Sequence, residues 1–229
     1  MAAAGSGERL GAGGPKAFVP VAGRPMVEWS VDAFRASGPV CSIVVAAPPG
    51  HVHDLGGSDL AVVAGGAARA ESVANALAAV GTDLVAIHDA ARPLLTAALV
   101  EALVAALAAA PEAAGVIAAV PLTDTVKRAR STRGSLLAPG ENKEPRVEIE
   151  ATLDRSELWA AQTPQLFRTE ALRAALAVEP VTRGAATDES MLVEAAGGRV
   201  LIHPTGPENL KVTTPHDLAV AELLLRGRG

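Results

Sequence analysis

Near its amino end the chain carries the glycine-rich segment Ala3-Ala4-Gly5-Ser6-Gly7-Glu8-Arg9-Leu10-Gly11-Ala12-Gly13-Gly14-Pro15-Lys16. Glycine lets backbone N–H groups converge on an anion because no Cβ atom stands in the way. Arg9 adds a planar guanidinium and Lys16 a mobile ammonium. The pattern is neither a Walker loop nor a GxGxxG dinucleotide motif, and glycine content alone also fits a flexible surface loop. Residues 18–25 form a turn that leads into a helix, which anchors Lys16 beside the loop and favours a phosphate site.

Outward from this loop, short apolar runs alternate with helical patterns. This alternation predicts an α/β fold of three layers, in which a mostly parallel nucleotide-binding sheet has helices on both faces. The expected strands are Cys41–Ala47, Leu60–Ala64, Leu84–His88, Gly115–Val120 and Arg199–His203. The expected helices are Pro25–Ser37, Arg69–Val80, Ala97–Ala109, Thr169–Ala177, Asp188–Ala196 and Pro215–Arg226. Thr214 and Thr187 are the expected caps of the last two helices.

A buried strand is expected to lead into the glycine-rich loop, yet only Met1–Ala4 precede Gly5. We expect either that the chain begins downstream of its natural start, which we favour, or that the first strand is unusually short. Cys41 lies at the start of an apolar run and is expected to be an inert thiol in a buried strand.

Residues 128–150 interrupt the alternation with a charged segment that contains glycine and proline. Short strands are expected on either side, at Asp124–Arg128 and Val147–Leu153. We interpret the segment as a protruding β-arm, inserted at about 124–160 into one domain that spans residues 1–229.

The composition excludes several classes of protein. The net charge of −5 argues against binding to a nucleic acid backbone. The arginine-rich part of the arm, 128–133, lacks interleaved aromatic residues and is expected to be solvated. The sequence contains neither an apolar run of about 20 residues nor a signal-peptide pattern, so we expect no membrane association. The single cysteine fits the reducing cytoplasm, where we place the protein.

Five motifs in order along the chain resemble one known family. They are AAGSGERLGAGGPKAF from residue 3, GGAARAESV at 65–73, HDAARP at 88–93, ATLDRSELWAAQTPQ at 151–165, and TDESMLVE with ENLKVTTPHDL at 187–194 and 208–218. Together they resemble the 2-C-methyl-D-erythritol 4-phosphate cytidylyltransferase family of the non-mevalonate isoprenoid route. The resemblance implies transfer of CMP from CTP to 2-C-methyl-D-erythritol 4-phosphate (methylerythritol phosphate), with release of pyrophosphate.

The resemblance also implies roles at the nucleotide. Arg9 and Lys16 stabilise the charge that develops on the phosphate oxygens, while Gly66 and Ser72 contact base and ribose. The family often has an acidic residue where Ala67 stands, so one base contact is open. The residues that line the nucleotide are Ala3, Ala4, Gly5, Ser6, Gly7 and Ala90.

Asp89 directly follows an expected strand, at the carboxyl edge where open α/β sheets bind ligands. A carboxylate there can hold Mg²⁺ against a triphosphate. The alternative roles for Asp89 are a helix cap or an ion pair with Arg92, and Arg92 itself is expected to be structural.

On the acceptor side, the resemblance assigns Arg155, Lys211 and Thr187 to the methylerythritol phosphate, with contributions from Thr163 and Thr125. In the family the arm crosses to a partner subunit, so we expect a homodimer in which Arg155 completes the neighbour's site. Without the resemblance, Arg155 would be an ordinary surface arginine.

Other functions stay open at this point. The motifs also fit a cytidylyltransferase for another polyol phosphate such as ribitol 5-phosphate, a transferase for another base, or a non-catalytic nucleotide-binding protein. His51 and His53 have no obvious further ligands for a metal ion, and His88 is expected to pack at a strand end instead of acting as a base.

Overall fold

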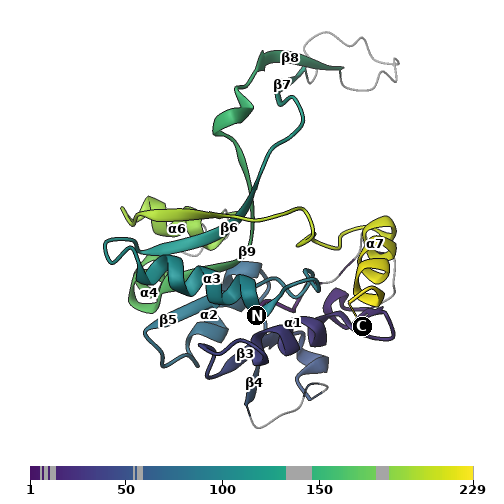
Figure 1. The fold of residues 1–229 in the computed structure, drawn as a ribbon, viewed down its shortest axis with the longest axis vertical. Coiled ribbons are helices and arrows are strands. Elements are labelled where there is room, and N and C mark those ends of the chain that lie inside the picture. The colour runs from purple at the N-terminus through teal and green to yellow at the C-terminus, as the bar shows by residue number, and fades with distance from the viewer. Residues whose placement is uncertain are drawn as a thin grey trace, which may run out of the picture.

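The structure is a computed structural model that describes residues 1–5, 7, 10, 14–53, 55, 59–132, 146–178 and 186–228. Its helices are α1 (Met26–Arg35), α2 (Arg69–Leu77), α3 (Ala97–Ala108), α4 (Thr169–Leu176), α6 (Glu189–Ala195) and α7 (Pro215–Arg226). Its strands are β1 (Pro20–Val21), β2 (Arg24–Pro25), β3 (Ile43–Ala47), β4 (Leu60–Ala64), β5 (Leu84–Ile87), β6 (Gly115–Pro121), β7 (Lys127–Thr132), β8 (Arg146–Thr152), β9 (Trp159–Arg168) and β10 (Val200–Pro204). Every expected strand and helix is present, with ends that differ by a few residues (Figure 1).

The central sheet is mixed, which corrects the expectation of a mostly parallel sheet. β10, β6, β9 and β5 are hydrogen-bonded in that order, and β9 runs antiparallel to both of its neighbours. β3 and β4 form a parallel pair. Ala2 joins the two groups, because it bridges in parallel to Ala46 of β3 and to Asp89 after β5. Residues 1–3 therefore take the strand position before the glycine-rich loop.

The strand β9 is absent from the sequence-based expectation, and its proline explains why. Proline cannot donate to a strand ladder and is normally confined to edges and bulges. Pairing with β5 ends at Gln165, adjacent to Pro164. The register of the pairing with β6 shifts between Ile117 and Ala119, and this bulge lies opposite the segment of β9 that contains Pro164. A central strand thus tolerates the proline.

Helices pack against both faces of the sheet. On one face, α1 and α3 pack on β3, β6 and β9, with Val31, Phe34 and Val100 in the core. On the other face, α2, α4 and α6 pack together over Ile87, Ile117 and Phe167. Within the described part of the chain, none of the helices combines the length and apolar character that crossing a bilayer requires.

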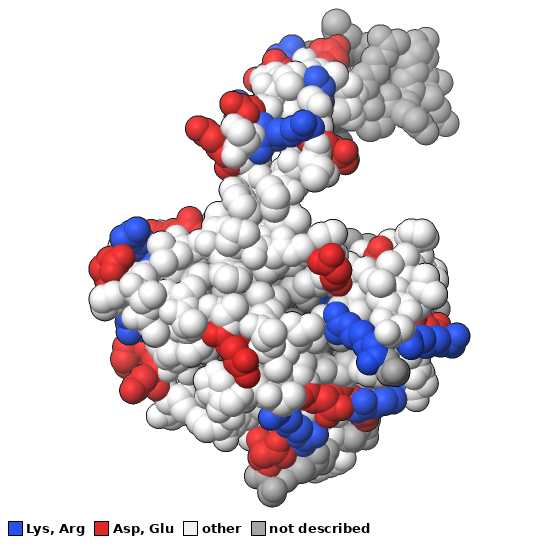
Figure 2. All heavy atoms as spheres, viewed as in Figure 1, with Lys and Arg blue, Asp and Glu red and all other residues white. Residues whose placement is uncertain are grey.

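The predicted arm is present as a hairpin that protrudes from the body (Figure 1). β7 pairs antiparallel with β8, and Arg130 lies 3.8 Å from Glu148 across the ladder. Figure 2 shows basic and acidic side chains interspersed along it, so the arginines do not form a purely basic surface. The part of the predicted arm at 133–145 lies outside the described residues.

Two local expectations are wrong. Cys41 is exposed, because β3 begins only at Ile43. The cap of α6 is Asp188, whose carboxylate accepts from the Met191 N–H at 3.0 Å, and not Thr187. Thr214 caps α7 as predicted, accepting from the Asp217 N–H.

Candidate active site

A cavity of about 670 Å³ opens at the carboxyl ends of the strands, beside residues 1–3 and the turns after β4 and β5. Its size suits a small-molecule ligand. The predicted residues that line it are Ala3, Ala4, Gly5, Gly7, Lys16, Gly66, Ser72, Asp89, Ala90 and Lys211. Segments far apart in the sequence thus meet at the edge where α/β sheets bind ligands.

The glycine-rich segment closes on itself and places Lys16 at the cavity. The Lys16 N–H donates to the Gly5 carbonyl at 3.2 Å. Gly7 has a φ of +73°, and a Cβ atom there would lie 2.9 Å from the Cβ of Lys16. Glycine is therefore required at position 7 for both its backbone conformation and this close approach. Ser6 and Arg9 lie outside the described residues.

The second glycine pair packs tightly against the first segment. A Cβ atom on Gly65 would lie 2.3 Å from the Cβ of Ala4. The Gly66 N–H donates to the Ser72 hydroxyl at 3.0 Å, and that hydroxyl donates to the Ala68 carbonyl at 3.2 Å. Ser72 therefore shapes the turn that borders the cavity.

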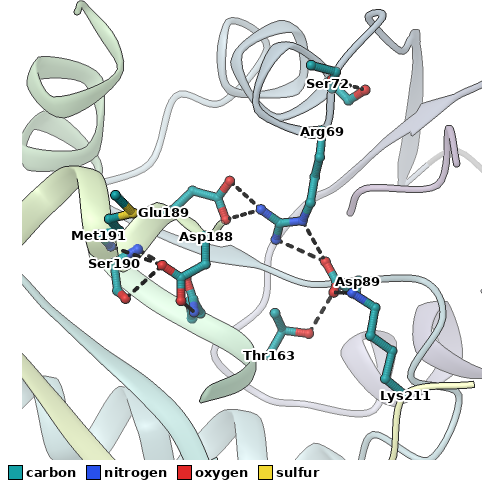
Figure 3. Close-up of polar contacts among 11 residues, drawn as sticks. Arg69, Ser72, Asp89, Thr163, Asp188, Glu189, Ser190, Met191 and Lys211 are labelled. Atoms are coloured by element: carbon teal, nitrogen blue, oxygen red, sulfur yellow. Dashed lines mark hydrogen bonds and ion pairs between the residues drawn. The ribbon is translucent and has the colours of Figure 1, made fainter. Parts of the chain in front are cut away.

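Asp89 is the centre of a charged network (Figure 3). Its Oδ2 accepts from Lys211 at 2.7 Å, and its Oδ1 accepts from Nε of Arg69 at 3.0 Å. Burial by itself would raise the pKa of the Asp89 carboxyl, but the charges of Arg69 and Lys211 outweigh burial and hold this pKa well below its ordinary value. Asp89 is therefore ionised, and its partners are Arg69 and Lys211, not Arg92.

Beneath Asp89, a buried chain of hydrogen bonds fixes the backbone. The Thr163 hydroxyl accepts from the Asp89 N–H at 3.0 Å and lies 3.2 Å from Nδ1 of His88. Nε2 of His88 lies 3.3 Å from the Arg92 carbonyl, which can only accept, so Nε2 carries the proton and Nδ1 accepts from Thr163. Burial lowers the pKa of His88 to about 3, so the ring is neutral and supports the strand end as predicted.

The segment that carries Lys211 is fixed on both sides. Nδ2 of Asn209 donates to the Thr163 carbonyl at 2.8 Å, and the Val212 N–H donates to the Ala91 carbonyl at 2.8 Å. Arg92 is buried and donates to the Asn209 carbonyl at 2.6 Å, which is a structural contact. Lys211 thus reaches the cavity from a well-anchored loop.

Four predicted acceptor residues are not among the described residues that line this cavity. Thr163 is buried below Asp89. Thr125 is exposed at the root of the arm, and Arg155 is exposed and donates to the Thr123 carbonyl. Thr187 is exposed just before the cap of α6.

Arg69 lines the cavity and was missed by the sequence analysis. One signal was available, since Arg69 opens α2 and a positive charge at a helix amino end is unfavourable. An arginine at such a position indicates a specific acidic partner elsewhere in the fold.

The donor set at Asp89 is compatible with a divalent cation. Asp89 is the one carboxylate among the described residues that line the cavity. Mg²⁺ is commonly held by one or two carboxylates together with substrate phosphates. The described residues contain no group of three or more His, Cys, Asp or Glu side chains that would hold a metal by themselves. Such an ion would therefore depend on a bound phosphate ligand.

Comparison with known proteins agrees with this geometry. The sequence pattern of IspD, 2-C-methyl-D-erythritol 4-phosphate cytidylyltransferase, matches residues 1–227. The protein of that name from Frankia casuarinae is 45% identical over 228 residues, which cover 97% of this chain and 79% of the relative. The Synechococcus protein is 39% identical over 236 residues, covering 100% of this chain and 97% of the relative.

A crystal structure of 2-C-methyl-D-erythritol 4-phosphate cytidylyltransferase from Thermus thermophilus superposes with a TM-score of 0.74 at 34% identity. The match covers 95% of this chain and 96% of the other. Fold and sequence thus lead to the same set of relatives.

Proposed function

Because this chain belongs to the 2-C-methyl-D-erythritol 4-phosphate cytidylyltransferase family, we propose that it transfers the cytidylyl group of CTP to methylerythritol phosphate. A phosphate oxygen of the acceptor attacks the α-phosphorus of CTP. The bond from the α-phosphorus to the bridging oxygen breaks, so that 4-diphosphocytidyl-2-C-methyl-D-erythritol forms and pyrophosphate leaves. The observation that carries this proposal is the single cavity edge where Lys16, Asp89 and Lys211 meet the glycine-rich segment.

The nucleotide half of the reaction is assigned to the cavity walls. Backbone groups of Ala3–Gly5 and of Gly7 face the phosphates, while Gly66 and Ala90 border the nucleotide. Ser72 supports the base and ribose through the Gly66 turn that its hydroxyl holds. Ser6 of the same loop also lines the nucleotide. Lys16, together with Arg9, stabilises charge on the phosphate oxygens, which is the main source of catalysis in phosphoryl-type transfer.

Mg²⁺ is the proposed cofactor, and it would neutralise charge on the triphosphate when bound. Asp89, the one carboxylate among the described residues that line the cavity, would hold it.

The acceptor half is assigned to Lys211 and to the residues around the arm. We propose that Arg155 and Thr187, with contributions from Thr125 and Thr163, position the methylerythritol phosphate. Arg155 is exposed in the short turn 155–157, which connects β8 of the protruding hairpin (Figure 1) to β9, and this exposure supports its action in a second copy of the chain.

We further propose that the chain is one nucleotidyltransferase domain into which the arm is inserted at about 124–160. Two copies of the chain form a homodimer through this arm. Val147 and Ile149 of β8 are 68% and 66% exposed. They are two residues apart and so project from the same face of the hairpin. Two aliphatic side chains on one face of a protruding ladder are suited to contact with another copy.

The proposed activity is tested by pyrophosphate release from CTP and methylerythritol phosphate in the presence of Mg²⁺. A panel of the four nucleoside triphosphates and of ribitol 5-phosphate as acceptor defines both specificities. We expect CTP with methylerythritol phosphate to give the highest kcat/KM. A purine nucleotide or ribitol 5-phosphate as the preferred substrate would contradict the proposal.

A further inference from the structure

Arg69, which lines the cavity, lies between the carboxylates of Glu189 and Asp89 (Figure 3). Its Nη1 donates to Oε1 and Oε2 of Glu189 at 2.6 and 2.8 Å. Its Nε and Nη2 both meet Oδ1 of Asp89, at 3.0 and 2.9 Å. All three nitrogens of the guanidinium thus have a carboxylate partner within the chain. Arg69 is therefore committed to the protein and has little capacity to bind a substrate.

The contacts divide the two oxygens of Asp89 between two cations. Oδ1 is held by Arg69, whose side chain is 30% exposed, and Oδ2 meets Lys211, whose side chain is 41% exposed. A carboxylate held by one oxygen cannot rotate freely, so its second oxygen keeps a fixed direction. The orientation of Oδ2 toward the cavity therefore depends on Arg69.

Glu189 anchors Arg69 from the opposite side. Its carboxylate is 1% exposed, and its pKa is raised by burial although the charge of Arg69 opposes that rise. Glu189 directly follows the Asp188 cap of α6. A planar guanidinium can serve two carboxylates at once, whereas an ammonium is a single point charge. The geometry therefore favours arginine over lysine at this position.

We propose that Arg69 is a positioning residue of the transfer reaction. It holds Oδ1 of Asp89 in place, so that Oδ2 binds the Lys211 ammonium and keeps it at the cavity. Arg69 acts only through Asp89 and does not touch the reacting atoms. This inference rests on the proposed roles of Asp89 and Lys211. A purely structural ion pair would instead contribute to folding and leave the reaction rate of the folded enzyme unchanged.

The proposal is tested by a double-mutant cycle of Arg69→Gln and Asp89→Asn. All variants carry Glu189→Gln, because loss of Arg69 would otherwise leave a buried carboxylate unpaired and unfold the chain. Urea unfolding confirms that each variant is folded. The changes in kcat/KM, kcat and KM caused by Arg69→Gln and Asp89→Asn, alone and together, are each measured relative to the Glu189→Gln protein. Coupled residues give non-additive effects in such a cycle.

We expect Arg69→Gln to lower kcat/KM by about 10- to 100-fold, the usual effect of losing a partner that orients a functional ligand. Once Asp89 is Asn, the added Arg69→Gln should cost less than about twofold, because its only path of action is already lost. Arg69→Lys should recover part of the loss. Arg24→Gln is the matched control, since Arg24 also pairs with two carboxylates, Glu28 and Asp32, away from the cavity.

The outcomes separate this inference from the proposed function. Effects of Arg69→Gln and Asp89→Asn that multiply fully, or a loss no larger than that of Arg24→Gln, would overturn the role of Arg69 alone. If Asp89→Asn leaves kcat/KM unchanged, the role of Asp89 is itself wrong and the inference fails with it.

Discussion

The cavity and the arm hold their charged side chains in opposite ways. In the cavity, Asp89 is 10% exposed at its side chain and meets Arg69 and Lys211 from the same chain. On the arm, Arg155 is exposed and contacts only the Thr123 carbonyl among the bonds described for it. The difference teaches that the described residues of one chain already pair the charges of the cavity, whereas our proposal that a second chain completes the acceptor half rests on an exposed arginine and is open to direct tests.

The largest effect is expected from the cavity. Lys16→Ala should lower kcat by about 10²- to 10³-fold, because its contact with the phosphates strengthens in the transition state. Steady-state kinetics with varied CTP measures kcat and KM separately. Arg173→Ala, on α4 and paired with Glu170, is the control and should keep kcat. A change in KM alone would show that Lys16 binds the ground state and transition state equally.

The arm is tested by mixing two inactive proteins, Arg155→Ala and Lys16→Ala. In a heterodimer, one site combines the intact Lys16 of one chain with the intact Arg155 of the other. Random exchange makes half of the dimers mixed, so about a quarter of wild-type activity should return. Exchange is verified with differently tagged chains. No recovery after complete exchange would place Arg155 in the site of its own chain.

The proposed dimer should weaken when the arm loses the two exposed aliphatic side chains of β8. Val147→Ser with Ile149→Ser should raise the dimer dissociation constant by about tenfold or more, which corresponds to about 1.4 kcal/mol. The free energy of unfolding should change by less than about 0.5 kcal/mol, because both side chains are exposed in one chain. Analytical ultracentrifugation measures the constant. Leu223→Ser, at a 73% exposed position on α7, is the matched control.

The effect with the least bearing on catalysis is a dependence of stability on pH, and it concerns the buried hydrogen bonds of His88 beneath Asp89. The pKa of His88 is lowered to about 3 by burial, from 6.5. As the pH falls below 6.5, the unfolded chain takes up a proton on His88 that the folded chain does not. The free energy of unfolding is therefore undiminished by His88 above this pH and falls progressively as the pH is lowered toward 3. Between pH 6.5 and 5 the loss should be about 1 to 2 kcal/mol.

Urea unfolding at several pH values measures this slope. His88→Gln should flatten it whatever the absolute stability of the variant, whereas His216→Gln, at an exposed position, should leave it unchanged. Equal slopes in the wild type and His88→Gln would mean that the imidazole is not held neutral.

Much of this fold was accessible from sequence, because its elements carry local signals. The apolar run of β4 and the Thr214-Pro215 start of α7 predicted the observed bounds. β9 was missed since Pro164 contradicts a central strand unless a bulge accommodates it. Cys41 was placed inside β3 because periodicity does not reveal where pairing begins. The cytoplasmic location stays a prediction.

The family and its reaction were recognised from five motifs, and the comparisons confirm that recognition. The network at Asp89 was beyond local reasoning, because its partners come from positions 69, 189 and 211. The ion pair with Arg92, which the sequence left open as an alternative role for Asp89, was the one nearest in sequence. Only the folded sheet brings Arg69 to the same carboxylate.

The position of residues 1–3 has a consequence for how the chain assembles. Ala2 and Ala3 bond to His88 and Ala46, and β5 pairs with β9, which ends at Arg168. Residues 1–3 thus pair with segments that lie more than 40 residues further along the chain, and such long-range pairing makes folding slow. The middle of the sheet closes only after the ribosome has passed residue 168, so until then the nascent chain exposes apolar strand edges that a chaperone would recognise.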